Sequence, residues 1–162
     1  MIREVTRYVG LAVLLFAVQL LVLNNINFNG YASPYIYPML LLVLPFGVRR
    51  WQQLLLGFAC GLLMDVFMHS LGLHATAMLV MSFVRLFVGP SDSTRLEAPG
   101  LDGGLLWYAR YVLVLVLIHH TVLILLASFT LHHLWLTLLR IALSTACSVL
   151  FILITSALRV RR

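Results

Sequence analysis

The feature that most constrains this chain is a succession of long apolar runs separated by short polar segments. Two of these runs, 106–129 and 134–158, exceed the roughly twenty residues that an α-helix needs to cross the hydrocarbon core of a membrane. The 162 residues are 62% hydrophobic and only 10% charged, whereas about a quarter of the residues in a soluble domain are charged. Too few polar side chains are present to cover a core in water. The sequence therefore predicts an all-α integral membrane protein.

Six apolar runs are candidates for transmembrane helices within a single domain, 1–162. The segment NNINFNG after the first run lacks the small-x-small pattern of a signal-peptide cleavage site, so we expect a retained membrane anchor. The second run contains three prolines. Ser33 can cap it, Pro34 suits a first helical position, and Pro45 marks its exit or a kink. The expected spans are 8–23, 34–47, 51–68, 73–88, 106–129 and 134–158, with a polar loop at 89–105.

The distribution of arginine predicts how these spans are oriented. The chain has eleven basic residues, all arginine, and a formal net charge of +6. Segments 24–33, 69–72 and 130–133 contain no arginine, whereas the alternate connections and the termini contain nearly all of them. Because positive residues remain on the cytoplasmic side, both termini and loop 89–105 are predicted to be cytoplasmic. The arginines are not clustered among aromatic residues, so no nucleic-acid partner is expected.

An aspartate interrupts the third apolar run and needs an explanation. Gly57, Gly61 and Asp65 are spaced by four residues, so they share one face of the predicted helix. The first two form a G-x-x-x-G pattern, which allows another backbone to approach closely. This face, including Asp65, is therefore predicted to point toward protein rather than lipid.

Arg140 is the candidate partner for this aspartate, because it is the one arginine that departs from the positive-inside pattern. Arg140, Ser144 and Ser148 are again spaced by four residues, on the sixth run. We hypothesise an intramembrane pair between Asp65 and Arg140 that locks the third span against the sixth, since charges in membranes pair or find water. In the alternative interpretation, Arg140 extends to the outer headgroups and Asp65 is hydrated from a cavity.

The remaining polar residues predict no chemistry. His119 and His120 are adjacent and point to different faces, so one of them is expected to face the bundle and form a hydrogen bond. One intramembrane carboxylate is not the pair that an aspartyl active site requires. The chain also lacks G-x-S-x-G, H-E-x-x-H and a phosphate-binding glycine loop. No catalytic residue, metal ion or cofactor is predicted. The other histidines, expected near the outer surface in a wet interfacial loop, are His69, His74, His132 and His133.

Two stretches, SPYIYPMLLLVLPFG and GFACGLLMDVFMHSLGLHA, in a chain of this length with six predicted spans, resemble the rod shape-determining protein MreD family. The resemblance is strongest over residues 20–90, whereas 90–162 match in hydropathy and length alone. It implies a fold similar to the membrane-embedded substrate-binding component of energy-coupling-factor vitamin transporters. It also implies a scaffold in the bacterial inner membrane that works with MreC, with RodA and its transpeptidase, and indirectly with MreB. Asp65 and the glycines before it are the positions that match the family motif, and none is catalytic.

The sequence leaves two other functions open. A substrate-binding subunit of a small-molecule transporter would use Asp65, Arg140 and the histidines to line a pocket near the outer face. A lipid-modifying membrane enzyme would need a nucleophile or a metal site that the sequence does not provide. A pocket open to the outside would favour the transporter subunit, and a closed, packed core would favour the scaffold.

Overall fold

The computed structural model describes residues 2–26, 31–88, 98–128 and 134–160, and within these ranges the regular structure is entirely helical. Four of the helices contain stretches long and apolar enough to cross a membrane, and α4, with 16 residues, is a shorter apolar helix. The chain is therefore an all-α protein with the helices of a membrane protein. The helices are α1 (Ile2–Leu21), α2 (Met39–Leu42), α3 (Arg50–Met68), α4 (Leu73–Val88), α5 (Leu105–Ser128) and α6 (Leu134–Val160), with 3-10 turns at Leu23–Asn25 and Leu101–Gly103.

The predicted helix over 34–47 is wrong, because helical structure in this segment is confined to the four residues of α2. A helix beginning at Pro34 would need the residue four positions later to donate its N–H to the Pro34 carbonyl. That residue is Pro38, which has no N–H and disfavours the helical conformation in the residue before it. The Pro34 carbonyl instead accepts a hydrogen bond from Nε2 of Gln19, at 3.2 Å. The chain therefore remains irregular up to Pro38.

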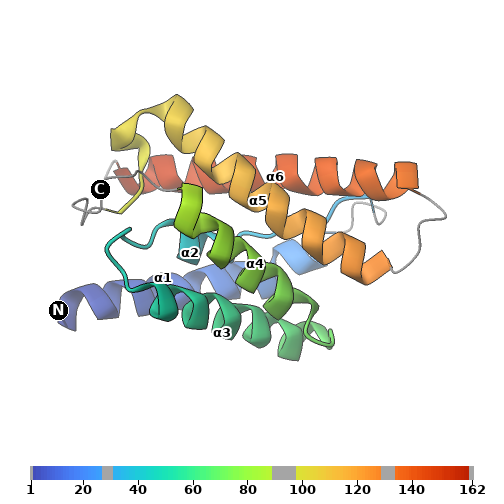
Figure 1. Ribbon diagram of the computed structural model, residues 1–162, viewed down its shortest axis with the longest axis horizontal. Helices are drawn as coiled ribbons and strands as arrows, with labels where there is room; N and C mark the ends of the chain where they lie inside the picture. The colour runs from blue at the N-terminus through green and yellow to red at the C-terminus, as the bar shows by residue number, and fades with distance from the viewer. Residues whose placement is uncertain (1, 27–30, 89–97, 129–133, 161–162) are drawn as a thin grey trace.

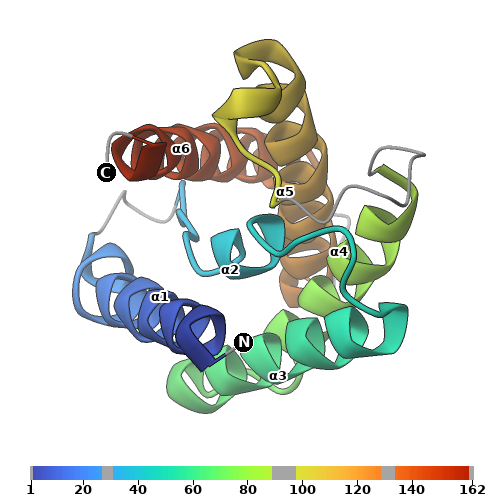
Figure 2. The same ribbon diagram turned by 90° about the vertical axis from the view of Figure 1, so that its left-hand side faces the viewer.

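This irregular segment occupies the centre of the molecule. Figure 2 shows α2 surrounded by α1, α3, α4, α5 and α6. Residues 34–44 are all buried, and the side chains of Tyr37, Met39, Leu41 and Leu42 are completely inaccessible. The centre of the hydrophobic core is therefore this short apolar segment and not a sixth long helix.

The chain runs back and forth between two ends of the molecule. Both termini lie at the same end, and the turn between α3 and α4 lies at the opposite end (Figure 1). Within the polar loop predicted at 89–105, residues 89–97 lie outside the described residues, and Leu101–Gly103 form a 3-10 turn.

Candidate functional site

Asp65 caps the start of α4 from its position near the end of α3. Its Oδ1 accepts hydrogen bonds from Ser70 Oγ at 2.6 Å and from the backbone N–H of His74 at 2.9 Å. Its Oδ2 accepts from the N–H of Ala75 at 2.8 Å. The residue just before a helix usually supplies such a cap, but here that residue is Gly72, which has no side chain. The negative carboxylate also lies at the positive, N-terminal end of the α4 dipole, which is a favourable electrostatic arrangement.

The two glycines before Asp65 allow α4 to lie directly on α3. A Cβ at Gly61 would lie only 2.5 Å from the Cα of Ala75 and 2.7 Å from its nitrogen. At Gly57 the added carbon would lie 3.1 Å from the Cβ of Ser82 and 3.2 Å from the carbonyl oxygen of Met78. The face formed by Gly57, Gly61 and Asp65 thus packs on α4, the next helix along the chain.

The hypothesised pair between Asp65 and Arg140 is not formed. Among the described residues the Asp65 carboxylate bonds to the turn and the start of α4, and the Arg140 guanidinium has no hydrogen bond or ion pair. Figure 2 shows α3 and α6 on opposite sides of α2. The physical reason is local: after a turn of four residues, two N–H groups with no partner inside α4 are already within reach of the carboxylate. The third span is therefore locked to the fourth, not to the sixth.

The serines that follow Arg140 on α6 hold the central segment. Ser144 Oγ accepts a hydrogen bond from the N–H of Ser33 at 2.9 Å, and Ser148 Oγ accepts one from the N–H of Tyr35 at 2.8 Å. Neither serine contributes to the expected contact between the sixth span and the third. Their hydroxyl groups instead satisfy backbone donors that lack a helical partner.

Gln19 on α1 also forms hydrogen bonds with the backbone of the central segment. Its Oε1 accepts from the N–H of Ile36 at 2.8 Å, while its Nε2 donates to the Pro34 carbonyl. Non-helical backbone is tolerated at membrane depth where protein groups satisfy its polar atoms. Side chains from α1 and α6 therefore replace the hydrogen bonds that a regular helix would have supplied.

Arg85 holds the other end of the segment and is 1% exposed. Its guanidinium donates to the Leu44 carbonyl, to Gln53 Oε1 and, at 2.7 Å, to the hydroxyl of Tyr111. It also lies 4.8 Å from the centre of the Phe46 ring, a cation–π contact. Among the side chains that the structure describes, no carboxylate pairs with it. Arg85 is thus an internal ligand of the backbone rather than one of the charges that mark the ends of the spans.

Both central histidines of α5 are buried, which corrects the expectation that one of them faces the bundle. The Tyr37 hydroxyl lies between His74 Nδ1, at 3.0 Å, and His119 Nε2, at 2.7 Å. The His120 ring lies beside that of His119, with ring centres 5.3 Å apart, and its Nε2 is 3.3 Å from Ser148 Oγ on α6. The reason is that α5 is covered on one face by the central segment and on another by α6, so adjacent residues both find protein.

Metal ligation is not evident in the described part of the chain, where no group of three histidine, cysteine, aspartate or glutamate side chains could hold an ion. His69 ends α3 in the left-handed conformation, with φ of 52°. His132 and His133 lie outside the described residues.

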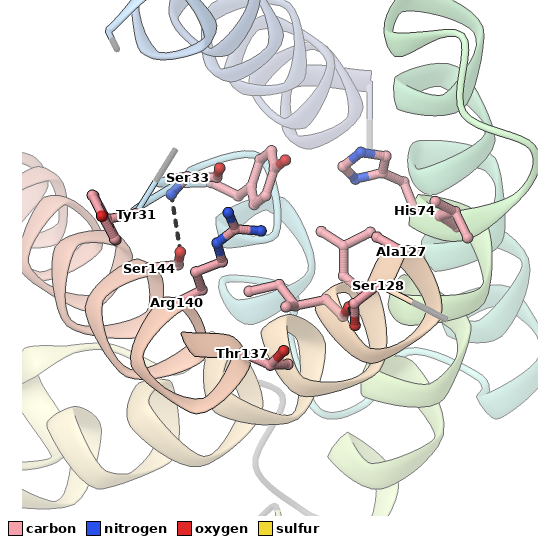
Figure 3. Close-up of a pocket in the computed structure, with 12 residues that line it drawn as sticks. Tyr31, Ser33, His74, Ala127, Ser128, Thr137, Arg140 and Ser144 are labelled. Atoms are coloured by element: carbon pink, nitrogen blue, oxygen red, sulfur yellow. Dashed lines mark hydrogen bonds between the residues drawn. The ribbon is translucent and has the colours of Figure 1, made fainter. Parts of the chain in front are cut away.

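A pocket of about 230 Å³ opens at the end of the molecule where α4 begins and α5 ends. Figure 3 shows the guanidinium of Arg140 pointing into the space between Ser33 and His74. Arg140 is the one charged residue of the lining, so the pocket can bind an anion through hydrogen bonds. The lining residues are Tyr31, Ser33, Tyr35, Leu73, His74, Leu123, Ile124, Ala127, Ser128, Thr137, Arg140 and Ser144.

No protein-family model, curated protein or solved structure matches this chain. Sequence reasoning overlooked Gln19 and Arg85 as internal ligands of the backbone, and Tyr37 as the hydroxyl that lies between His74 and His119. A signal was available, because each is a polar side chain within an apolar run, where it must find a partner.

Proposed function

We propose that this protein is a non-enzymatic membrane scaffold of the MreD kind, acting in the elongation complex that builds the cell wall at a bacterial inner membrane. The observation that carries this proposal is the packed interior, in which residues 34–44 are all buried among the surrounding helices. The backbone of that segment bonds to side chains of four surrounding helices, namely α1, α4, α5 and α6. A packed centre suits a protein whose partners bind to its outside.

The size of the pocket favours the scaffold over the transporter subunit. Sites for small organic molecules usually occupy about 300–1,000 Å³, whereas this pocket is about 230 Å³. A vitamin-sized substrate would require the central segment or the end of α5 to move. The substrate-binding subunit remains the second candidate because Arg140 and His74, two of the residues expected to line its pocket, do line this one.

The surface expected to meet protein partners is the lipid-facing side of the helices. Large apolar side chains are exposed there, including Val66 and Phe67 on α3 and Phe83 and Phe87 on α4. The expected partners are MreC, RodA and its transpeptidase, with MreB reached indirectly. Membrane lipids cover the rest of this surface.

In this proposal both termini and loop 89–105 are cytoplasmic, and the chain crosses the membrane six times. The second crossing is the irregular segment 34–47, protected from lipid by the surrounding helices. Two observations support this topology: the alternation of arginine between connections and the shared end of the two termini.

Cysteine labelling tests the topology. Cys60 and Cys147 are free and are first replaced by alanine. Leu71→Cys, at a position that is 100% exposed in the turn between α3 and α4, should then react with a membrane-impermeant maleimide in intact spheroplasts. Gly103→Cys should not react in intact spheroplasts and should react once the membrane has been permeabilised. The reverse pattern would contradict the proposed orientation.

Co-purification tests the scaffold function. The tagged full-length chain is expressed with the MreC-type protein of the same organism, extracted in mild detergent and passed over a sizing column. We expect the two to elute together, whereas an unrelated bitopic protein of similar size should separate. Separation of MreC, combined with saturable binding of a vitamin to the purified chain, would refute the scaffold and establish the transporter subunit.

A further inference from the structure

The pocket beside Arg140 has the charge of an anion site. Its twelve lining residues include one arginine and no aspartate or glutamate. The nearby Asp65 does not neutralise this arginine, because its carboxylate oxygens bond to Ser70 and to the first turn of α4. A guanidinium presents donors in a planar fork that fits the oxygens of phosphate.

His74 supplies a second donor from the opposite wall. Its side chain is 3% exposed, and Nδ1 bonds to the hydroxyl of Tyr37. Among the described residues, Nε2 has no hydrogen-bond partner. When Tyr37 donates to Nδ1 and accepts from His119, the neutral imidazole of His74 carries its hydrogen on Nε2, where it can be donated to a ligand.

The pocket lies near the ends of three apolar helices, where a membrane-spanning helix meets the lipid headgroups. Arg140 is the seventh residue of α6, about 9 Å along the axis from its first residue. His74 is the second residue of α4, and Ser128 is the last residue of α5. The polar groups therefore lie near the ends of three helices, and Leu73, Leu123 and Ile124 form an apolar wall beside them.

We propose that this pocket binds a phosphate group, with Arg140 as the main ligand and His74 as a second donor. The phosphate can belong to the headgroup of an anionic phospholipid, with the start of its chains on the apolar wall, or to a small soluble phosphate ester. This inference concerns a ligand site and does not depend on the scaffold function or on any protein partner.

Lipid titration of the purified full-length protein tests the proposal. Native mass spectrometry from detergent measures binding of phosphatidylglycerol and of diacylglycerol with the same chains, which lacks the phosphate. Calorimetry measures binding of sn-glycerol 3-phosphate, with glycerol as its control. We expect Arg140→Gln to weaken binding of the phosphate compound at least about tenfold, the loss typical of a charge-assisted hydrogen bond. Arg110→Gln, at the other end of α5, should leave binding within about twofold.

The outcomes separate the two sources of phosphate. Loss of phosphatidylglycerol binding in Arg140→Gln, with weak diacylglycerol binding throughout, identifies a lipid; the same loss for glycerol 3-phosphate alone identifies a soluble ester. Equal binding by Arg140→Gln and the unmodified protein, or no binding of either compound, overturns the proposal. Ala127→Trp fills the pocket without changing a charge and should also abolish binding, so it provides the same test if Arg140→Gln does not fold.

Discussion

Asp65→Ala is expected to lower the free energy of unfolding by about 3–5 kcal/mol, because two buried N–H groups and a hydroxyl lose their acceptor. The carboxylate accepts all three of these hydrogen bonds from Ser70, His74 and Ala75. Gly72, just before α4, has no side chain that could replace the cap. Reversible unfolding in mixed detergent and dodecyl sulfate micelles, followed by circular dichroism, measures the change.

Double-mutant cycles show which partner Asp65 has. With Ser70→Ala, which removes a donor to the carboxylate, the coupling should exceed about 0.5 kcal/mol. With Arg140→Gln the two effects should add to within about 0.5 kcal/mol, because the groups share no contact. Strong coupling to Arg140 would restore the ion pair and contradict the helix cap.

Gly61→Ala is expected to cost about 3 kcal/mol, the upper end for overpacking a well-filled contact. The new methyl group would meet the backbone of Ala75, which cannot move without displacing α4 and with it the N–H groups bonded to Asp65. The same unfolding assay, together with the elution profile of the protein, measures the effect.

Two other glycines serve as controls for Gly61→Ala. A Cβ added at Gly10 would meet no neighbouring atom within 4 Å. Gly10→Ala should therefore leave the free energy of unfolding unchanged or raise it by up to about 1 kcal/mol. The loss of stability caused by Gly57→Ala should lie between the effects of Gly10→Ala and Gly61→Ala, because the atom nearest to the added methyl group is the hydroxyl of Ser82, which can rotate away. Equal effects at all three glycines would show that helix propensity, rather than the contact of α3 with α4, explains the loss.

The long apolar runs were predictable because their signal is local. Hydrophobicity and length alone place helices near 51–68, 73–88, 106–129 and 134–158, and the structure has α3, α4, α5 and α6 there. The segment 34–47 was not predictable in this way, because its hydropathy is that of a span while Pro34 and Pro38 prevent a regular helix. The spacing of four residues correctly grouped Gly57, Gly61 and Asp65 on one face.

The sequence by itself determined that this chain is helical and apolar, and that Asp65 must have a partner, because burial of an isolated charge is unfavourable wherever it occurs. Only the tertiary structure decided which partner. A carboxylate can be satisfied by a distant guanidinium or by the first N–H groups of a neighbouring helix, and spacing along the chain does not distinguish them. The turn after α3 brings those N–H groups within 2.9 Å. Among the described residues Arg140 has no carboxylate partner, and it lines the pocket.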